Sequence, residues 1–420
     1  MEHPPPRSLA EIVTDGAIAR ADADAAFAAA LGDHAGIEFN RDGNRMQVRA
    51  VRNRDRDIDT TGTVVAEIRD GLWTWCSDTA AAAAERFGIP ELTGAQPVSD
   101  DLVAAARTLH YCTPCFLAPM PDGCTAVVCL DPPQPTGDTR TAMITAATVP
   151  GCTGDLPRSL SGFAAIRGLD VTSDGSVWRF SDGTAVRVRD GRLRDISGGL
   201  DIDEIRADAL LPSVESQMYL DARVPGATAA VDPHRGLVTL RDVDGAETHA
   251  RGVILATVTG DTWCWGWADR HIGRSPSTSA CHRIRDFGRR EGVPAFVSPT
   301  VPLALARELD LVSAAKPVLG MWYHATVQLN SDTWAVVVFA DAALALPPPT
   351  VRAVEAVIDV VRDAVPDGVD GHRAIAGYAR FRGLRPLPTG DPGSVSLPVT
   401  DGTVTVRFSP GGGMTGTTAR

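Results

Sequence analysis

The stretch from Gly252 to Trp265 reads GVILATVTGDTWCW, and it matches without a gap the stretch from Gly62 to Trp75, which reads GTVVAEIRDGLWTW. Two further matches follow in the same order: Gly162–Leu169 with Gly377–Leu384, and Asp182–Val188 with Asp401–Arg407. Three ordered matches of this kind indicate an internal duplication. The sequence therefore predicts two copies of one domain, each of roughly 200 residues.

The matches also set the expected domain limits. The first copy is expected at residues 8–195 and the second at residues 201–410, with a short junction at residues 196–199. Residues 1–7, which include three consecutive prolines, are predicted to form a disordered N-terminus. The Gly- and Thr-rich residues 411–420 are predicted to form a flexible tail.

Helical and extended patterns are mixed within each copy. Ser8-Leu-Ala-Glu11 has the spacing of a capping box, so we expect a helix to begin there and to continue to about Leu31. Residues Ile37 to Arg49 alternate apolar and polar side chains around a central Asp-Gly, which predicts a hairpin, and another hairpin is expected to close each copy. Because neighbouring strands are joined by hairpins, the predicted class is α+β, with two tandem homologous domains that each have a mainly antiparallel sheet and packed helices.

The Trp-rich end of the matched stretch is the strongest local signal. Trp263, Trp265 and Trp267 alternate with small residues, so on an extended strand all three indoles share one face. Such a face is too apolar to remain uncovered. It belongs either to a core strand packed under a helix or to a binding groove for a peptide or an aromatic ligand. The first copy keeps two of the positions, Trp73 and Trp75, which favours the core.

Aromatic residues are more frequent in the second copy than in the first. Trp322, Tyr323 and Trp334 have Thr or Pro residues at or near the equivalent positions of the first copy. Aromatic residues that packing does not require tend to anchor interfaces. Together with the Trp263–Trp267 stripe, Trp322 and Tyr323 are therefore candidate binding residues, unless the second copy simply has a bulkier core.

A resemblance to a known family rests on the Trp-rich segment. Residues 262–269 read TWCWGWAD and residues 287–294 read FGRREGVP. With the helix and hairpin expected before them, they resemble a bacterial domain-of-unknown-function family numbered 6882, whose members carry a strand ending in Trp-x-Trp-x-Trp-Ala-Asn. Asp269 replaces that Asn. The resemblance covers residues 202–341 and, more weakly, residues 8–131, and it implies a fold more than a function.

Several cysteines and glycines could be taken for chemical motifs. His110-Tyr-Cys-Thr-Pro-Cys115 contains a C-x-x-C, but it precedes a predicted strand instead of opening a helix, and the second copy has Met321 and His324 at the matching positions. Cys112 and Cys115 are expected to be reduced core cysteines, with a zinc site completed by Cys76 and Cys124, or redox chemistry, as alternatives. Residues 411–416 match G-x-G-x-x-G, but the chain ends too soon afterwards for a helix that could meet a phosphate.

No catalytic motif accompanies the remaining polar residues. His324 could act as a general base, but no nucleophile or carboxylate is linked to it by spacing, so a packed or surface histidine is the expectation. We expect neither a metal nor a cofactor.

Composition narrows the classes of partner. The 40 basic and 52 acidic residues give a formal net charge of -12, which disfavours nucleic acid as a partner. The longest apolar runs are too short to span a membrane, and the N-terminus lacks the features of a signal peptide, so a cytoplasmic location is expected. Lys316 is the only lysine, a bias typical of GC-rich genomes such as those of actinobacteria.

These observations favour a non-catalytic protein-binding or chaperone-like module. Two pseudo-equivalent domains offer a broad surface, and the order of elements is similar to that of small secretion-chaperone-like domains, which bind client peptides. The alternative is an enzyme with an unrecognised active site in a cleft between the copies, near His324 or the segment from Cys112 to Cys124. The partner is expected to be another protein, and the sequence leaves the oligomeric state open.

Overall fold

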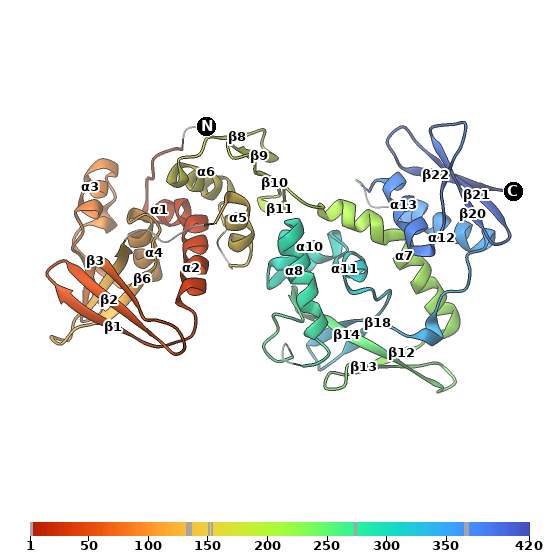
Figure 1. Cartoon of the computed structure of the whole chain (residues 1–420), viewed down its shortest axis with the longest axis horizontal. Helices are drawn as coiled ribbons and strands as arrows, with labels where there is room; N and C mark the ends of the chain where they lie inside the picture. Colours follow the sequence, from red (N-terminus) through yellow and green to blue (C-terminus); the bar gives the residue numbers. More distant parts are fainter. Residues whose placement is uncertain (1–2, 132–136, 150–151, 153, 273–274, 365–368) are drawn as a thin grey trace. The chain divides into compact units, whose positions relative to one another are not determined.

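The computed structural model describes the whole chain except residues 1–2, 132–136, 150–151, 153, 273–274 and 365–368. The chain divides into two compact units, Met1–Gly198 and Gly199–Arg420, and the division falls inside the junction that the sequence predicts (Figure 1). Each unit contains a curled, half-barrel sheet, a smaller four-stranded sheet and several helices, so the class is α+β with antiparallel sheets.

The first unit contains a seven-stranded sheet in its described part, with the order β1-β2-β3-β4-β5, while β7 pairs with the other edge of β3 and then with β6. The strands are β1 (His34–Asp42), β2 (Arg45–Arg52), β3 (Ile58–Arg69), β4 (Leu72–Trp75), β5 (Ala95–Pro97), β6 (Cys115–Pro119), β7 (Thr125–Asp131), β8 (Val171–Ser173), β9 (Val177–Phe180), β10 (Ala185–Arg189) and β11 (Arg192–Ile196). The helices are α1 (Leu9–Asp15), α2 (Ala17–Leu31), α3 (Asp78–Phe87), α4 (Asp100–Leu109), α5 (Thr139–Ala147) and α6 (Leu156–Arg167).

The second unit repeats this strand order: β12-β13-β14-β15-β16, with β18 paired to the other edge of β14 and then to β17. The strands are β12 (Thr228–Asp232), β13 (Leu237–Arg241), β14 (Glu247–Thr259), β15 (Thr262–Trp265), β16 (Thr300–Pro302), β17 (Tyr323–Gln328), β18 (Thr333–Ala340), β19 (Leu387–Pro388), β20 (Ser394–Val399), β21 (Gly402–Phe408) and β22 (Met414–Ala419). The helices are α7 (Ile202–Arg223), α8 (His282–Glu291), α9 (Pro294–Val297), α10 (Leu303–Glu308), α11 (Leu311–Leu319), α12 (Val351–Ala364) and α13 (Gly371–Arg382).

The matched sequences lie on β3 and β14, which are the central strands of the two curled sheets. Each pairs with two strands along one edge and with one strand along the other, and each has a register shift, between Val64 and Ala66 in β3 and between Ile254 and Ala256 in β14. The first residue of each match is a glycine in close contact, because a Cβ on Gly252 would lie 2.2 Å from a methyl carbon of Val238. The pattern shared by the two stretches therefore coincides with a register shift in the central strand and with a glycine position that has no room for a side chain.

Several sequence expectations are corrected by contacts between distant segments. The helix expected from Ser8 to Leu31 divides at Gly16, where a Cβ would lie 2.2 Å from Thr108 Oγ1 of α4. The hairpins expected to close each copy are four-stranded sheets, β8–β11 and β19–β22.

Both ends of the chain are more ordered than the sequence suggests. Within the tail expected to be flexible, residues Met414–Ala419 form β22, which pairs with β21. In the expected disordered N-terminus, residues 1–2 lie outside the described residues, but His3 contacts both Asp15 and Ser161. No helix in the described part of the chain is long and apolar enough to cross a membrane.

Candidate functional site

Trp263 and Trp265 lie inside the core of the second unit. Their side chains are 3% and 0% exposed, and their rings meet edge to face with centroids 5.4 Å apart. Trp265 Nε1 donates a hydrogen bond to the Ala295 carbonyl at 2.9 Å, which satisfies the buried indole. Because both rings are covered by their own unit, they offer no surface to a ligand, and the structure favours the core interpretation of the stripe.

Trp267 lies beyond the end of β15 and is only half-buried. The Arg285 guanidinium lies over its ring, 5.4 Å from the centroid, so a cation already occupies one face of the indole. Trp267 therefore belongs to the margin of the core and does not continue the face formed by Trp263 and Trp265.

The candidate residues Trp322 and Tyr323, which lie just before and at the start of β17, have different surroundings. Tyr323 is buried against Phe339, its hydroxyl donates to the Leu344 carbonyl, and burial raises its pKa to about 12. Trp322 is half-buried and packs on Phe381 of α13 with ring centroids 4.5 Å apart. Trp322 thus lines a pocket of the second unit.

This pocket, which we call the Trp322 pocket, has a volume of about 260 Å³ and lies among α7, α8, α11 and α13 of the second unit. Its walls are mainly apolar, and its polar groups are Asp208 and Arg380; the apolar walls include Ile205, Phe287, Trp322 and Phe381. An apolar pocket with a few polar groups is the usual form of a ligand site. The arrangement can hold an apolar group and orient it with one carboxylate and one guanidinium.

The two charged residues of the Trp322 pocket differ in their contacts. Asp208 Oδ2 accepts a hydrogen bond from Arg373 Nη2 at 2.9 Å, whereas Asp208 Oδ1 is buried and has no hydrogen-bond partner. Arg380 is exposed and forms no ion pair with any residue that the structure describes. A ligand could therefore pair with Arg380 and reach Asp208 through Oδ2, because the Asp208 side chain is 17% exposed while its Oδ1 is buried.

A buried polar cluster lies elsewhere on α7 and α11. Lys316 is fully buried, and its Nζ donates to Ser213 Oγ at 2.6 Å; Ser213 Oγ lies 3.0 Å from Ser313 Oγ. Burial lowers the pKa of Lys316 to about 8. Burial, and then the charge of Lys316, lower the pKa of His324 to about 3, so this imidazole is neutral.

A lysine with a lowered pKa beside a serine can activate a nucleophile. Here, however, Lys316 is 0% exposed and Ser213 is 5% exposed, so a substrate has no access to either group. His324 Nδ1 is also buried without a hydrogen bond. We therefore interpret this cluster as structural. In the sequence Lys316 stands out only as the single lysine, and neither its burial nor its contact with Ser213 follows from that count.

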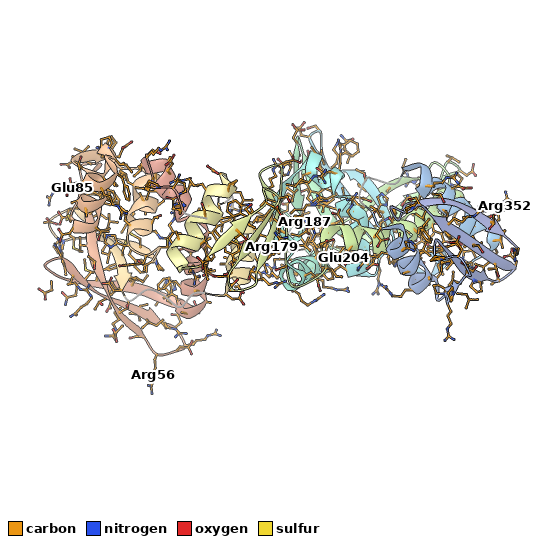
Figure 2. All side chains as sticks on the ribbon, turned by 90° about the horizontal axis from the view of Figure 1, so that it is seen from above. Arg56, Glu85, Arg179, Arg187, Glu204 and Arg352 are labelled. Atoms are coloured by element: carbon orange, nitrogen blue, oxygen red, sulfur yellow. The ribbon has the colours of Figure 1, made fainter. Side chains whose placement is uncertain are left out.

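The same ion pairs recur where two helices cross in each unit. In the first unit, Arg158 of α6 contacts Glu11 at 3.1 Å and Asp15 at 2.7 Å on α1. In the second unit, Arg373 of α13 contacts two carboxylates of α7, Glu204 at 2.6 Å and Asp208 at 2.9 Å. Figure 2 labels Glu204 within the second unit. A further ion pair joins Arg167 to Asp22 in the first unit, and Arg382 and Glu215 form the corresponding pair in the second unit.

The cysteines do not gather into a site. Cys112 is buried, and burial raises its pKa to about 11, while Cys115 lies directly opposite Cys129 on the neighbouring strand. All eight cysteines are free thiols. Among the described residues, no group of three or more His, Cys, Asp or Glu side chains is placed to hold a metal ion.

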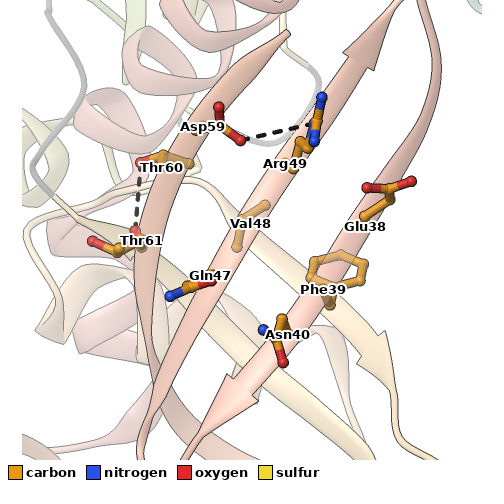
Figure 3. A pocket seen from close by; sticks show the side chains of 9 residues that line it. All are labelled: Glu38, Phe39, Asn40, Gln47, Val48, Arg49, Asp59, Thr60 and Thr61. Atoms are coloured by element: carbon orange, nitrogen blue, oxygen red, sulfur yellow. Dashed lines mark hydrogen bonds and ion pairs between the residues drawn. The ribbon is translucent and has the colours of Figure 1, made fainter.

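A second, more polar depression lies on β1, β2 and β3 of the first unit (Figure 3). It measures about 580 Å³, and its lining includes Phe39, Gln47, Arg49 and Asp59. Arg49 is already engaged, at 3.9 Å from Asp59 and 2.5 Å from Asp57. Because its guanidinium is paired within the sheet, this surface offers less unsatisfied charge to a ligand than the Trp322 pocket does.

Residues 203–342 match the model of a family of unknown function, DUF6882. No curated protein and no solved structure matches the chain. The matched range includes Lys316 and Trp322 but ends before α13, which supplies Arg380 and Phe381. The Trp322 pocket is therefore built partly from residues outside the matched range.

Proposed function

We propose that the protein is a non-catalytic binding module that holds a segment of another protein in the Trp322 pocket. The observation that carries this proposal is the position of Trp322, which remains half-buried at an apolar pocket while its neighbour Tyr323 enters the core. Large aromatic side chains at a pocket are typical anchors of protein interfaces. The location that we propose is the cytoplasm of a bacterium with a GC-rich genome, such as an actinobacterium.

We propose further that the chain is a tandem duplication and that its first unit is a divergent copy of the second. The identical strand orders and the corresponding Arg–carboxylate pairs support this origin. The aromatic pair at the pocket differs between the units, because Thr113 and Ile166 stand where the second unit has Trp322 and Phe381. The binding function is accordingly assigned to the second unit.

Binding is preferred to catalysis because two groups of the second unit whose pKa values are strongly shifted by burial are closed to substrate. Lys316 and Tyr323 are both buried by side chains of their own unit. An enzyme would need such groups to reach the reacting atoms. The polar groups that do face the Trp322 pocket, Asp208 and Arg380, are suited to orienting a ligand.

Site-specific photocrosslinking in the producing cells tests this proposal. A benzophenone amino acid at Arg380 should form adducts with a partner protein, because this exposed position lines the pocket. The same probe at Val243, which is 72% exposed on a turn of the second unit, serves as the control. Adducts that form equally at both positions, or that persist unchanged in a Trp322→Ala background, would exclude the Trp322 pocket as the binding site.

A further inference from the structure

The helix crossing beside the Trp322 pocket has a counterpart in the first unit. A Cβ on Gly377 of α13 would lie 2.8 Å from the Asp208 carbonyl oxygen of α7, and a Cβ on Gly162 of α6 would lie 2.5 Å from that of Asp15 of α1. In both units an Arg four residues before the glycine contacts the aspartate, through Arg158 or Arg373. The two crossings thus present equivalent carboxylate and guanidinium groups.

In the first unit, an extended segment of the chain covers this crossing. His3 Nε2 lies 3.1 Å from Asp15 Oδ2, and His3 Nδ1 lies 3.1 Å from Ser161 Oγ. Arg158 Nη2 donates to the Pro4 carbonyl at 3.5 Å. Figure 1 shows this segment starting near α6 and running to α1. Three consecutive prolines follow His3, and proline favours the extended polyproline conformation.

In the second unit, the residues before α7 take another path. The Leu200 N–H donates to Glu291 Oε2 at 3.1 Å, and Gly199 lies so close to the Glu291 backbone that a Cβ would approach it to 2.5 Å. The crossing is correspondingly more open, since the side chain of Arg373 is 27% exposed and that of Arg158 is 12% exposed. The carboxylate oxygen Oδ1 has no hydrogen-bond partner among the described residues in either crossing, neither in Asp15 nor in Asp208, so the difference in exposure of the two arginines is what distinguishes them.

We infer that this open crossing, together with the Trp322 pocket, binds an extended proline-rich peptide segment of a partner protein that carries a histidine before its prolines. The inference rests on the proposed function and names the class of ligand. The imidazole of the peptide donates to Asp208 Oδ2, as His3 Nε2 contacts Asp15 Oδ2, and a peptide carbonyl accepts from Arg373, as Pro4 accepts from Arg158. The prolines pack against Trp322 and Phe381.

The difference in aromatic residues between the units agrees with this assignment. The first unit holds a segment of its own chain, which is always at high local concentration, so weak contacts suffice. A segment from another protein has to be bound from solution and needs larger apolar contacts. Trp322 and Phe381 provide them, and aromatic grooves bind polyproline segments well because such segments are already extended before binding.

The test uses the full chain and a fluorescently labelled peptide with the sequence HPPPRSL of residues 3–9, followed by fluorescence anisotropy. We expect saturable binding that weakens at least tenfold with Trp322→Ala and several-fold when the peptide histidine is replaced by alanine. Ala376→Trp provides a second variant, because Ala376 is exposed on α13, one residue before Gly377, and an indole there obstructs the crossing without entering the core. Ala165→Trp, at an exposed position of α6 in the first unit, is the control and should leave binding unchanged.

Each outcome decides the inference. Absence of peptide binding would show that the ligand is not a proline-rich peptide of this kind. If crosslinks at position 380 still form in that case, the proposed binding function remains supported although the inference about its ligand is wrong. Peptide binding that is lost in Ala165→Trp but retained in Ala376→Trp places the peptide on the first unit and overturns the inference. A dimer of the full chain that Trp322→Ala dissociates would identify a second copy as the occupant and would exclude a separate partner. The inference is supported if Trp322→Ala and Ala376→Trp both weaken binding and if binding requires the peptide histidine.

Discussion

Lys316 Nζ donates a hydrogen bond of 2.6 Å to Ser213 Oγ, and this contact places the single lysine of the chain in the interior of the second unit, between α11 and α7. A buried ammonium loses its hydration and regains little of it from one hydroxyl group. The protonation of the Lys316 amine is therefore linked to folding. Asp310 at the start of α11 favours the charged form, but its effect on the pKa of Lys316 is smaller than that of burial.

The first prediction concerns Lys316 at alkaline pH. Its folded pKa of about 8 lies below the value of about 10.4 expected in the unfolded chain. Between these values the unfolded state binds more protons than the folded state, so the contribution of Lys316 to the free energy of unfolding rises with pH. The rise should be absent in Lys316→Met. Urea denaturation from pH 7 to 10 measures it, and parallel curves for the two proteins would contradict the prediction.

The same substitution should change stability near neutral pH. At pH 7 the wild-type chain buries a charge that Lys316→Met lacks, so the variant should be more stable, by at most about 3 kcal/mol on the basis of 1.36 kcal/mol per pKa unit. Loss of the hydrogen bond to Ser213 offsets part of this gain, although Ser313 remains 3.0 Å from that hydroxyl. A variant clearly less stable than the wild type would show that the charged hydrogen bond outweighs the cost of burial.

The second prediction concerns His324 at acidic pH. Its folded pKa of about 3 lies below the unfolded value of about 6.5, so between these values the unfolded state binds more protons and stability falls as pH decreases. His324→Leu should weaken this acid dependence, whereas the same change at the exposed His234 should not. NMR of the imidazole nitrogens provides a direct check, because His324 should remain neutral at pH 5. A charged His324 at that pH would refute the burial argument.

Sequence patterns predicted those parts of the fold that depend on local order. The apolar residues of β3 and β14 and the Trp pattern of β15 repeat in both units because each position meets the same strand partners. The strand β22 was missed because its residues, MTGTTA, are polar or small, and the backbone of β21 provides the hydrogen bonds that order it. A pattern within the strand cannot reveal such a partner.

The candidate site was predictable only in part for the same reason. Trp322 was identified from its aromatic character, but its partner Phe381 comes from a helix far along the sequence, and Asp208 comes from another. Likewise, Ser213 and Lys316 are 103 residues apart. Contacts of this kind depend on the crossing of α7 with α11 and α13, which local periodicity does not specify.

The third prediction separates a core indole from a pocket indole. Trp265→Ala removes a fully buried ring and its hydrogen bond to Ala295, so it should lower the free energy of unfolding by about 3–5 kcal/mol. Trp322→Ala removes a half-buried ring and should cost clearly less. Thermal or urea denaturation of both variants measures the difference. Equal losses of stability would show that Trp322 is as much a core residue as Trp265.

The fourth prediction concerns Gly377, where α13 crosses α7. A Cβ at this position would lie 2.8 Å from both the Cα and the carbonyl oxygen of Asp208, and these are backbone atoms that cannot move aside as a flexible side chain can. Gly377→Ala should therefore force the two helices apart and lower the free energy of unfolding by about 1–3 kcal/mol, despite the higher helix propensity of alanine.

Separation of α13 from α7 should also disturb the Trp322 pocket, because Asp208, Gly377 and Phe381 all line it. Gly377→Ala is thus expected to weaken both crosslinking at position 380 and binding of the HPPPRSL peptide. The matched control is Gly390→Ala, since a Cβ at Gly390 meets no atom within 4 Å and should change neither stability nor binding. If Gly377→Ala is as stable as the wild type and binds as well, then the close helix crossing does not maintain the pocket, and the second unit must adjust by moving α13 as a whole.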